Sequence, residues 1–141
     1  MIAEITRQLR RDEGEMLHAY QDHLGYWTIG IGRLIDKRKG GGITVEEADY
    51  LLLNDINKRI VDLKHLLPWF DDLDEARQGV LLNMAFQLGV KGLMGFINTL
   101  ACVAKGDYDA AAKGMLNSLW AKQTPARAER MAKQMITGKW Q

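Results

Sequence analysis

The chain has 141 residues, 47% of them hydrophobic and 26% charged, which is an ordinary globular composition with enough apolar residues for one core or two small lobes. Its single cysteine, Cys102, excludes an internal disulfide framework, and the surrounding run FINTLACVA favours a buried structural thiol. No window approaches about 20 apolar residues. The N-terminal stretch also lacks the apolar core of a secretory signal, so we expect neither a membrane span nor a signal peptide.

The formal net charge is only +1, but the basic residues are concentrated near the C-terminus. Between Lys113 and Gln141 there are six Lys or Arg residues and one acidic residue, Glu129. A basic face suits an anionic partner such as nucleic acid, an acidic lipid surface or an acidic cell-wall polymer. A solvated helix face explains the same charges equally well.

The first expected elements are a short helix and a group of strands. Apolar residues at helical spacing predict a helix from Ile2 to Asp12, with Gly14 as its C-terminal stop. From Tyr20 to about Ile35, β-forming residues punctuated by glycines predict short strands and turns. The stretch DKRKGGG, residues 36–42, predicts a charged turn.

A long helix is expected next, because Thr44 and Glu47 form a capping box ahead of an apolar stripe that continues to Leu66. Pro68 ends this helix. Residues 74–88 are apolar over most of a helical circumference, which predicts a buried central helix.

Three further helices are expected in the last third of the chain. The first runs from Leu93 to Ala104, after the turn GVKG, and the second runs through KGDYDAAAKGMLNSLW with Asp107 near its start. The third is basic, with Thr124 as N-cap and Pro125 in its first turn, and ends at Gly138. The fold class is therefore α+β, mainly α. We expect a small mixed lobe (13–43), a connecting helix (44–66) and a helical lobe (67–141).

Two carboxylates stand close together near the start of the chain. Glu13 lies at the end of the first helix, and Asp22 precedes the glycine-rich turn that carries Thr28. Cleavage of a glycosidic bond needs one protonated carboxyl group and one ionised carboxylate, which two such residues across a groove can supply. Two unrelated surface carboxylates would give the same spacing.

Other kinds of site are poorly supported. TIGIG lacks the third glycine and the βαβ unit of a dinucleotide fingerprint, and the histidines have no acidic or cysteine cluster beside them. We therefore expect no metal and no cofactor. Aromatic residues such as Trp27 and Phe86 could line a saccharide groove, although the apolar helix around Phe86 favours the core.

Five segments in a fixed order resemble the phage lysozymes of glycoside hydrolase family 24, of the T-even type. They span nearly the whole chain: DEGEMLHAYQDHLGYWTIGIGRLI, ITVEEADYLLLNDI, DLDEARQGVLLNMAFQLG, GFINTL and SLWAKQTPARAER. The resemblance implies a two-lobed lysozyme-like fold in which residues 1–12 form a helix packed on the C-terminal lobe. It also implies hydrolysis, with inversion, of the β-1,4 bond between N-acetylmuramic acid and N-acetylglucosamine in peptidoglycan.

The resemblance assigns roles to individual residues. Glu13 matches the general acid, Asp22 the carboxylate that orients or activates the attacking water, and Thr28 the hydroxyl that helps to hold this water. Arg127 matches an arginine that pairs with the catalytic glutamate. Three further positions match saccharide contacts: Leu34, Phe86 and Thr99.

The chain also departs from the family pattern. Only RLIDKRKGGGI separates Gly32 from the second helix, where the family carries a longer segment, so we expect a more open groove. Arg33 replaces a histidine that pairs with an aspartate matched by Asp55. Leu24 and Leu119 replace an ion pair across the cleft and form either an apolar latch or two independent surface residues. Gly114 replaces a polar sugar contact.

The resemblance implies an endolysin that lyses the host at the end of phage infection. Such an enzyme would be a monomer that accumulates in the host cytoplasm, does not insert into the membrane, binds no nucleic acid and reaches the periplasm and wall with the help of a holin. A prophage-encoded or tail-associated muramidase is an alternative, although a free-standing chain of this length favours the endolysin. A non-catalytic wall-binding module and a nucleic-acid-binding helical protein are the alternatives from other classes.

Overall fold

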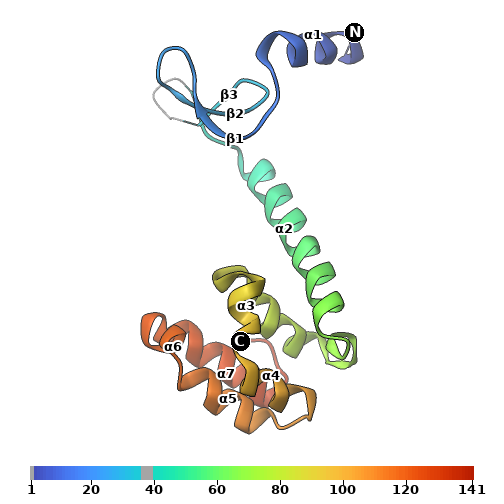
Figure 1. The fold of residues 1–141 in the computed structure, drawn as a ribbon, viewed down its shortest axis with the longest axis vertical. Helices are drawn as coiled ribbons and strands as arrows, with labels where there is room; N and C mark the ends of the chain where they lie inside the picture. Colours follow the sequence, from blue (N-terminus) through green and yellow to red (C-terminus); the bar gives the residue numbers. More distant parts are fainter. Residues whose placement is uncertain (1, 36–39) are drawn as a thin grey trace. The chain divides into compact units, whose positions relative to one another are not determined.

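The computed structural model describes residues 2–35 and 40–141, except for the side chain of residue 5. Part of the expected turn, residues 36–39, lies outside the described residues. The chain divides into two compact units, Met1–Leu51 and Leu52–Gln141 (Figure 1). Helices predominate and the strands form one small sheet, which confirms the α+β, mainly α, fold class.

The first unit begins with helix α1, Ile2–Glu13, as the apolar spacing predicts. The helix ends where Gly14 adopts a φ of 76°, which favours glycine, and its N–H donates to the carbonyl of Arg10 at 3.1 Å. Glu13 is therefore the last helical residue. Its side chain leaves the helix at the point where the chain turns toward the sheet.

The sheet has three antiparallel strands in the order β1, β2, β3 (Figure 1). They are β1, Met16–Gln21, β2, Trp27–Gly30, and β3, Arg33–Leu34, so the first strand starts earlier than the glycine pattern predicts. Thr28 stands at the centre, paired with Tyr20 on one side and with Leu34 on the other. With 2% of its surface exposed, it is the one fully buried residue within the described part of the first unit.

Helix α2, Val45–Leu66, follows the predicted capping box. The N–H of Thr44 donates to Glu47 Oε2 at 2.9 Å, and the N–H of Glu47 donates to Thr44 Oγ1 at 3.2 Å. These two bonds satisfy N–H groups that the first turn of a helix leaves unpaired. The helix ends before Pro68, and a 3₁₀ turn, η2, Phe70–Asp72, leads into the helices of the second unit.

Helix α3, Glu75–Met94, is the buried central helix that the sequence predicts. Asp74 caps it by accepting a hydrogen bond from the N–H of Arg77. The helix is broken at Gly89, whose φ of 77° and ψ of 158° redirect the chain inside the predicted GVKG turn. Residues after this break continue as a short helical segment, so the helix expected from Leu93 starts only at Ile97.

The remaining helices are α4, Ile97–Ala104, α5, Tyr108–Leu116, α6, Leu119–Gln123, and α7, Pro125–Thr137. The single helix expected up to Trp120 is wrong, because the chain breaks after α5 and Ser118 caps α6 by accepting from the N–H of Ala121. Thr124 is also not a side-chain cap for α7, since its hydroxyl donates to the carbonyl of Trp120 at 2.9 Å. Pro125 and Gly138 do mark the ends of α7 as predicted.

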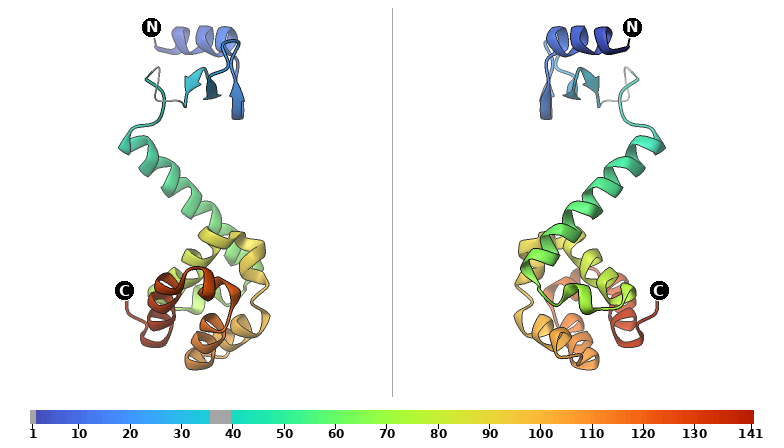
Figure 2. Two further views of the ribbon diagram at one scale, coloured as in Figure 1. Left: turned by 90° about the vertical axis from the view of Figure 1, so that its left-hand side faces the viewer. Right: turned by 90° about the vertical axis from the view of Figure 1, so that its right-hand side faces the viewer.

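The core of the second unit forms where these helices meet α3, and α5 and α7 lie side by side within it (Figure 2). Each helix contributes buried side chains, among them Val80, Met84, Leu100, Val103, Met115, Trp120, Met131 and Met135. Cys102 packs against this core but is only half-buried, so the buried structural thiol that the sequence favours is partly exposed. No single described helix is both long and apolar enough to span a membrane, although the bent pair Glu75–Met94 and Ile97–Ala104 meets that test together by length and composition.

Candidate active site

Glu13, the candidate general acid, lies against the backbone of Gly32. A Cβ atom at position 32 would stand 2.8 Å from Glu13 Oε2, and the φ of Gly32 is +70°. A glycine here serves both purposes, because it lets the carboxylate approach and accepts a positive φ. The last turn of α1 and the turn between β2 and β3 thus meet at the Glu13 carboxylate.

Asp22, the candidate base, organises the turn between β1 and β2. Its Oδ1 accepts hydrogen bonds from the N–H groups of Leu24 and Tyr26, both at 2.9 Å, and its own N–H donates to the carbonyl of Tyr26 at 2.8 Å. One carboxylate oxygen is therefore fixed by the backbone. The other, Oδ2, has no hydrogen-bond partner among residues 2–35 and 40–141 and is available for chemistry.

Thr28 lies two residues beyond this turn, and its Oγ1 donates to the carbonyl of Tyr26 at 3.1 Å. Because the hydroxyl proton is committed to the carbonyl, the oxygen lone pairs remain able to accept a hydrogen bond. Leu34, a candidate saccharide contact, is the cross-strand partner of Thr28. The structure thus brings four candidate residues, Glu13, Asp22, Thr28 and Leu34, into the first unit.

Phe86 and Arg127 belong to the second unit and line one cavity of about 380 Å³. Phe86 is 39% exposed, so the core position that its helix favours is wrong. The guanidinium of Arg59 lies over its ring, with Cζ 4.7 Å from the centroid. An exposed aromatic ring held by a cation is suited to contact a ligand.

Arg127 is held by Asn83. Its Nε donates to Asn83 Oδ1 at 2.7 Å, and its Nη2 donates to the carbonyl oxygen of Asn83 at 3.1 Å. The pairing of Arg127 with Glu13 would join the two units and stays a prediction. The packing of residues 1–12 on the helical lobe also stays a prediction.

Thr99 lies in the first turn of α4 and is 6% exposed. A Cβ atom at position 114 would stand 2.5 Å from Thr99 Oγ1, so the glycine that replaces the family's polar residue leaves room for this threonine. The role of Thr99 as a saccharide contact stays a prediction. The roles assigned to the other six candidate residues also stay predictions: Glu13, Asp22, Thr28, Leu34, Phe86 and Arg127.

Arg33 has a partner that sequence reasoning missed. Its Nη2 lies 2.6 Å from Glu47 Oε1, its Nη1 lies 3.1 Å from Glu47 Oε2, and Nη1 also donates to the carbonyl of Gly42. Hydrogen bonds from the Thr44 N–H and then from Arg33 hold the pKa of the Glu47 carboxyl below its usual value. The predicted pairing of Arg33 with Asp55 of the second unit stays a prediction.

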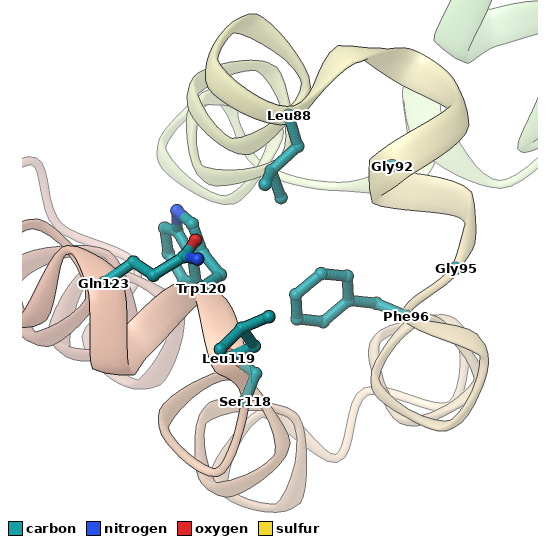
Figure 3. Close-up of a pocket in the computed structure, with 8 residues that line it drawn as sticks. All are labelled: Leu88, Gly92, Gly95, Phe96, Ser118, Leu119, Trp120 and Gln123. Atoms are coloured by element: carbon teal, nitrogen blue, oxygen red, sulfur yellow. The ribbon is translucent and has the colours of Figure 1, made fainter.

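A second cavity of the helical unit, of about 430 Å³, is drawn in Figure 3. Phe96 and Trp120 form part of its wall, edge to face, with centroids 6.3 Å apart. Leu119 is exposed at this cavity, and Figure 3 shows its side chain directed toward Phe96. Leu119 therefore has an apolar neighbour within its own unit, while the latch with Leu24 stays a prediction.

The described part of the chain contains no group of three or more His, Cys, Asp or Glu side chains that could hold a metal ion. Sequence reasoning overlooked Asn83, the residue that holds Arg127. Asn83 was visible as a polar residue within an apolar helix, a position that usually requires a specific hydrogen-bond partner.

Comparisons with known proteins identify the family of the chain. The phage lysozyme family model matches residues 10–135. The chain is 32% identical, over 98% of its length, to a probable T4-type lysozyme of Dictyostelium discoideum, of which it covers 96%. It is 32% identical, over 84% of its length, to the endolysin of Salmonella phage P22, of which it covers 80%. It is also 36% identical, over 95% of its length, to the pre-baseplate central spike protein Gp5 of Enterobacteria phage T4, but spans only 28% of that protein. The chain therefore belongs to the phage lysozyme family and is a hydrolase of the lysozyme class.

Proposed function

We propose that the protein hydrolyses the β-1,4 bond between N-acetylmuramic acid and N-acetylglucosamine in peptidoglycan, with inversion at the anomeric carbon. Hydrolysis of peptidoglycan accords with membership of the phage lysozyme family and with relatives named as endolysin and peptidoglycan hydrolase. The observation that carries the finer proposal is the environment of Asp22. Its Oδ1 is fixed by two backbone N–H groups, while Oδ2 has no partner within the described part of the chain.

In the proposed reaction, Glu13 gives its proton to the glycosidic oxygen as the bond from that oxygen to the anomeric carbon breaks. A water molecule forms the new bond from the opposite face and loses one proton to Asp22 Oδ2. Thr28 Oγ1 accepts a hydrogen bond from this water. Entry of water opposite the leaving group inverts the anomeric centre.

Three further positions are proposed as saccharide contacts, Leu34, Phe86 and Thr99. Arg127 is proposed to support Glu13 by pairing with its carboxylate. No cofactor takes part in this scheme.

For the biological role, we propose an endolysin that acts as a monomer. It accumulates in the host cytoplasm and reaches the periplasm and wall through a membrane permeabilised by a holin. The similarity to the P22 endolysin, over 80% of that protein, supports this role.

A second candidate role is a muramidase carried by the phage tail. The 36% identity to a segment of the central spike protein of phage T4 favours it. Mass spectrometry of purified virions separates the two roles, because a tail enzyme is a stoichiometric virion component. Expression in host cells with and without a holin tests the proposed route to the wall, since an enzyme that accumulates in the cytoplasm lyses only the cells in which the holin is present.

The chemistry is tested by the clearing of permeabilised Gram-negative cells, with Glu13→Gln as the matched variant. Glutamine keeps the size of the side chain but has no proton to donate, so we expect clearing to be lost while the thermal midpoint is retained. A folded Glu13→Gln protein with near-normal clearing would overturn the assignment. Salt-sensitive DNA binding without clearing would favour the nucleic-acid alternative instead. The anomeric form of the first product, read by proton NMR, tests inversion.

A further inference from the structure

The guanidinium of Arg127 is held at two points by a single residue. Nε donates to the side-chain oxygen Oδ1 of Asn83 at 2.7 Å, and Nη2 donates to the main-chain oxygen of the same residue at 3.1 Å. A guanidinium has five N–H donors in a rigid plane, and two bonds to one residue fix the orientation of that plane. Arg127 comes from α7 and Asn83 from α3, so the bonds cross between two helices.

Asn83 is an unusual residue for its place in α3. Met84, the next residue, and Val80, about one turn earlier, are fully buried, and this part of the helix packs into the core of the second unit. A half-buried amide in such surroundings costs stability unless its polar atoms find partners. The partner that its side-chain oxygen has found is Arg127.

Other hydrogen bonds also join α3 to α7. Gln134 of α7 already donates from Nε2 to the carbonyl of Ala76 in α3 at 2.7 Å, and both groups lie in the buried region. Arg77 of α3 donates from Nε and Nη2 to the carbonyls of Met135 and Ile136 at the end of α7. What distinguishes the Asn83 bonds is that they fix a charged group at the cavity wall.

Asn83, Phe86 and Arg127 all line the same cavity of about 380 Å³. The Nη1 group of Arg127 has no hydrogen-bond partner among residues 2–35 and 40–141, so its donors remain available. We propose that Asn83 is a positioning residue, which holds the guanidinium of Arg127 so that the unused donors are presented in one fixed direction. This inference rests on the proposed function, in which Arg127 supports the catalytic carboxylate.

A long arginine side chain that is free to change rotamer would have to be ordered in each catalytic cycle. Asn83 orders it beforehand, which is how a fixed charge contributes most to a reaction. We therefore expect Asn83→Leu, which has similar volume and no acceptor, to lower kcat by about 10- to 100-fold with a smaller effect on KM.

The decisive experiment is a double-mutant cycle with Arg127→Met, scored on kcat and KM for soluble peptidoglycan fragments. If Asn83 acts through Arg127, then Asn83→Leu has almost no further effect in the Arg127→Met background. Gln134→Met is the matched control, because it also removes a hydrogen bond from α7 to α3 but does not touch Arg127. We expect this control to lower the thermal midpoint while leaving kcat close to that of the unchanged protein.

The possible failures can be told apart. If the unchanged protein does not cleave peptidoglycan, the proposed function is wrong. If it cleaves peptidoglycan but Asn83→Leu leaves kcat unchanged, or lowers it equally in both backgrounds, the positioning role of Asn83 is wrong.

An NMR measurement keeps the inference testable if Asn83→Leu folds poorly. The Nε–H resonance of Arg127 should exchange slowly with solvent in the unchanged protein and rapidly in Asn83→Ser, whose shorter side chain does not reach the guanidinium. Equal exchange rates in the two proteins would overturn the inference.

Discussion

The carboxylate of Glu13 and the backbone of Gly32 are in such close contact that no side chain fits between them. A Cβ atom at position 32 would lie 2.8 Å from Glu13 Oε2 and 3.1 Å from Glu13 Cδ. The glycine therefore leaves room for the carboxylate at this place. A substitution there acts on the candidate general acid as well as on the backbone.

We expect Gly32→Ala to lower kcat/KM by about tenfold or more, because the added methyl group displaces the Glu13 carboxylate. Gly30→Ala is the matched control. Gly30 has a φ of +69°, so it suffers the same backbone strain, but its Cβ would meet no atom within 4 Å. Comparable losses of activity in the two variants, measured at equal folded fractions, would show that the contact with Glu13 is unimportant.

Two substitutions of Asp22 are expected to distinguish its structural role from its chemical role. Asp22→Asn keeps an oxygen to accept from the N–H groups of Leu24 and Tyr26, so it should fold normally but lose activity. Asp22→Ala loses the acceptor as well and should be less stable by about 1 to 2 kcal/mol. Urea denaturation and clearing assays on both variants measure this difference. An active Asp22→Asn protein would contradict a role for Asp22 as the base.

Glu47 is expected to make the stability of the first unit sensitive to acid. Its pKa is held below the usual value by the hydrogen bond from Thr44 and then by Arg33. A depressed pKa contributes stability that is present above the pKa of the unfolded chain and is lost as the pH falls through the folded pKa. Glu47→Gln should therefore be destabilising at neutral pH, with a difference that fades below about pH 4. The urea midpoints of Glu47→Gln and of the unchanged protein at several pH values measure this difference in stability.

Glu46→Gln is the control for this pH dependence, because no ion pair of Glu46 is found within the described part of the chain. We expect its stability, relative to the unchanged protein, to vary little over the same range. If the difference in urea midpoint between Glu47→Gln and the unchanged protein stayed constant from neutral to acid pH, the predicted coupling between the ionisation of Glu47 and stability would be wrong.

The contact between Gly114 and Thr99 predicts that the effect of Gly114→Ala on stability changes sign when Thr99 is replaced by alanine. Alanine is a better helix former than glycine by about 1 kcal/mol, so Gly114→Ala would ordinarily stabilise α5. Its Cβ would stand 2.5 Å from Thr99 Oγ1, and overpacking of this kind costs about 1 to 3 kcal/mol. We expect Gly114→Ala to destabilise the unchanged protein and to stabilise Thr99→Ala. The same sign in both backgrounds, read from thermal midpoints, would rule out this clash.

The features that the sequence predicts well are governed by neighbouring residues. The capping box of Thr44 and Glu47, the stop at Gly14 and the apolar helix around Met84 depend on spacing alone, and the structure confirms them. The exposure of Phe86 could not be read in this way, because it depends on whether other helices cover that side of α3.

Two other features escaped prediction because they depend on distant groups. The partner of Arg127 comes from a residue 44 positions away, and no local pattern specifies it. The break before α6 arises because Ser118 donates to the carbonyl of Met115 and accepts from the N–H of Ala121, so its side chain competes with continuation of the helix. In the stretch from Glu13 to Thr28, the candidate residue types could be found from the sequence, whereas their hydrogen bonds could not.

The polar bonds between α3 and α7 have a consequence during synthesis of the chain. Asn83, Ala76 and Arg77 are translated 44 to 58 residues before their partners Arg127, Gln134 and Met135. Until then, the apolar face of α3 that includes Val80 and Met84 lacks the side chains of α7 that complete its core. The helical unit can therefore close only after nearly all of it has emerged, and the nascent chain carries an uncovered α3 that a chaperone can bind.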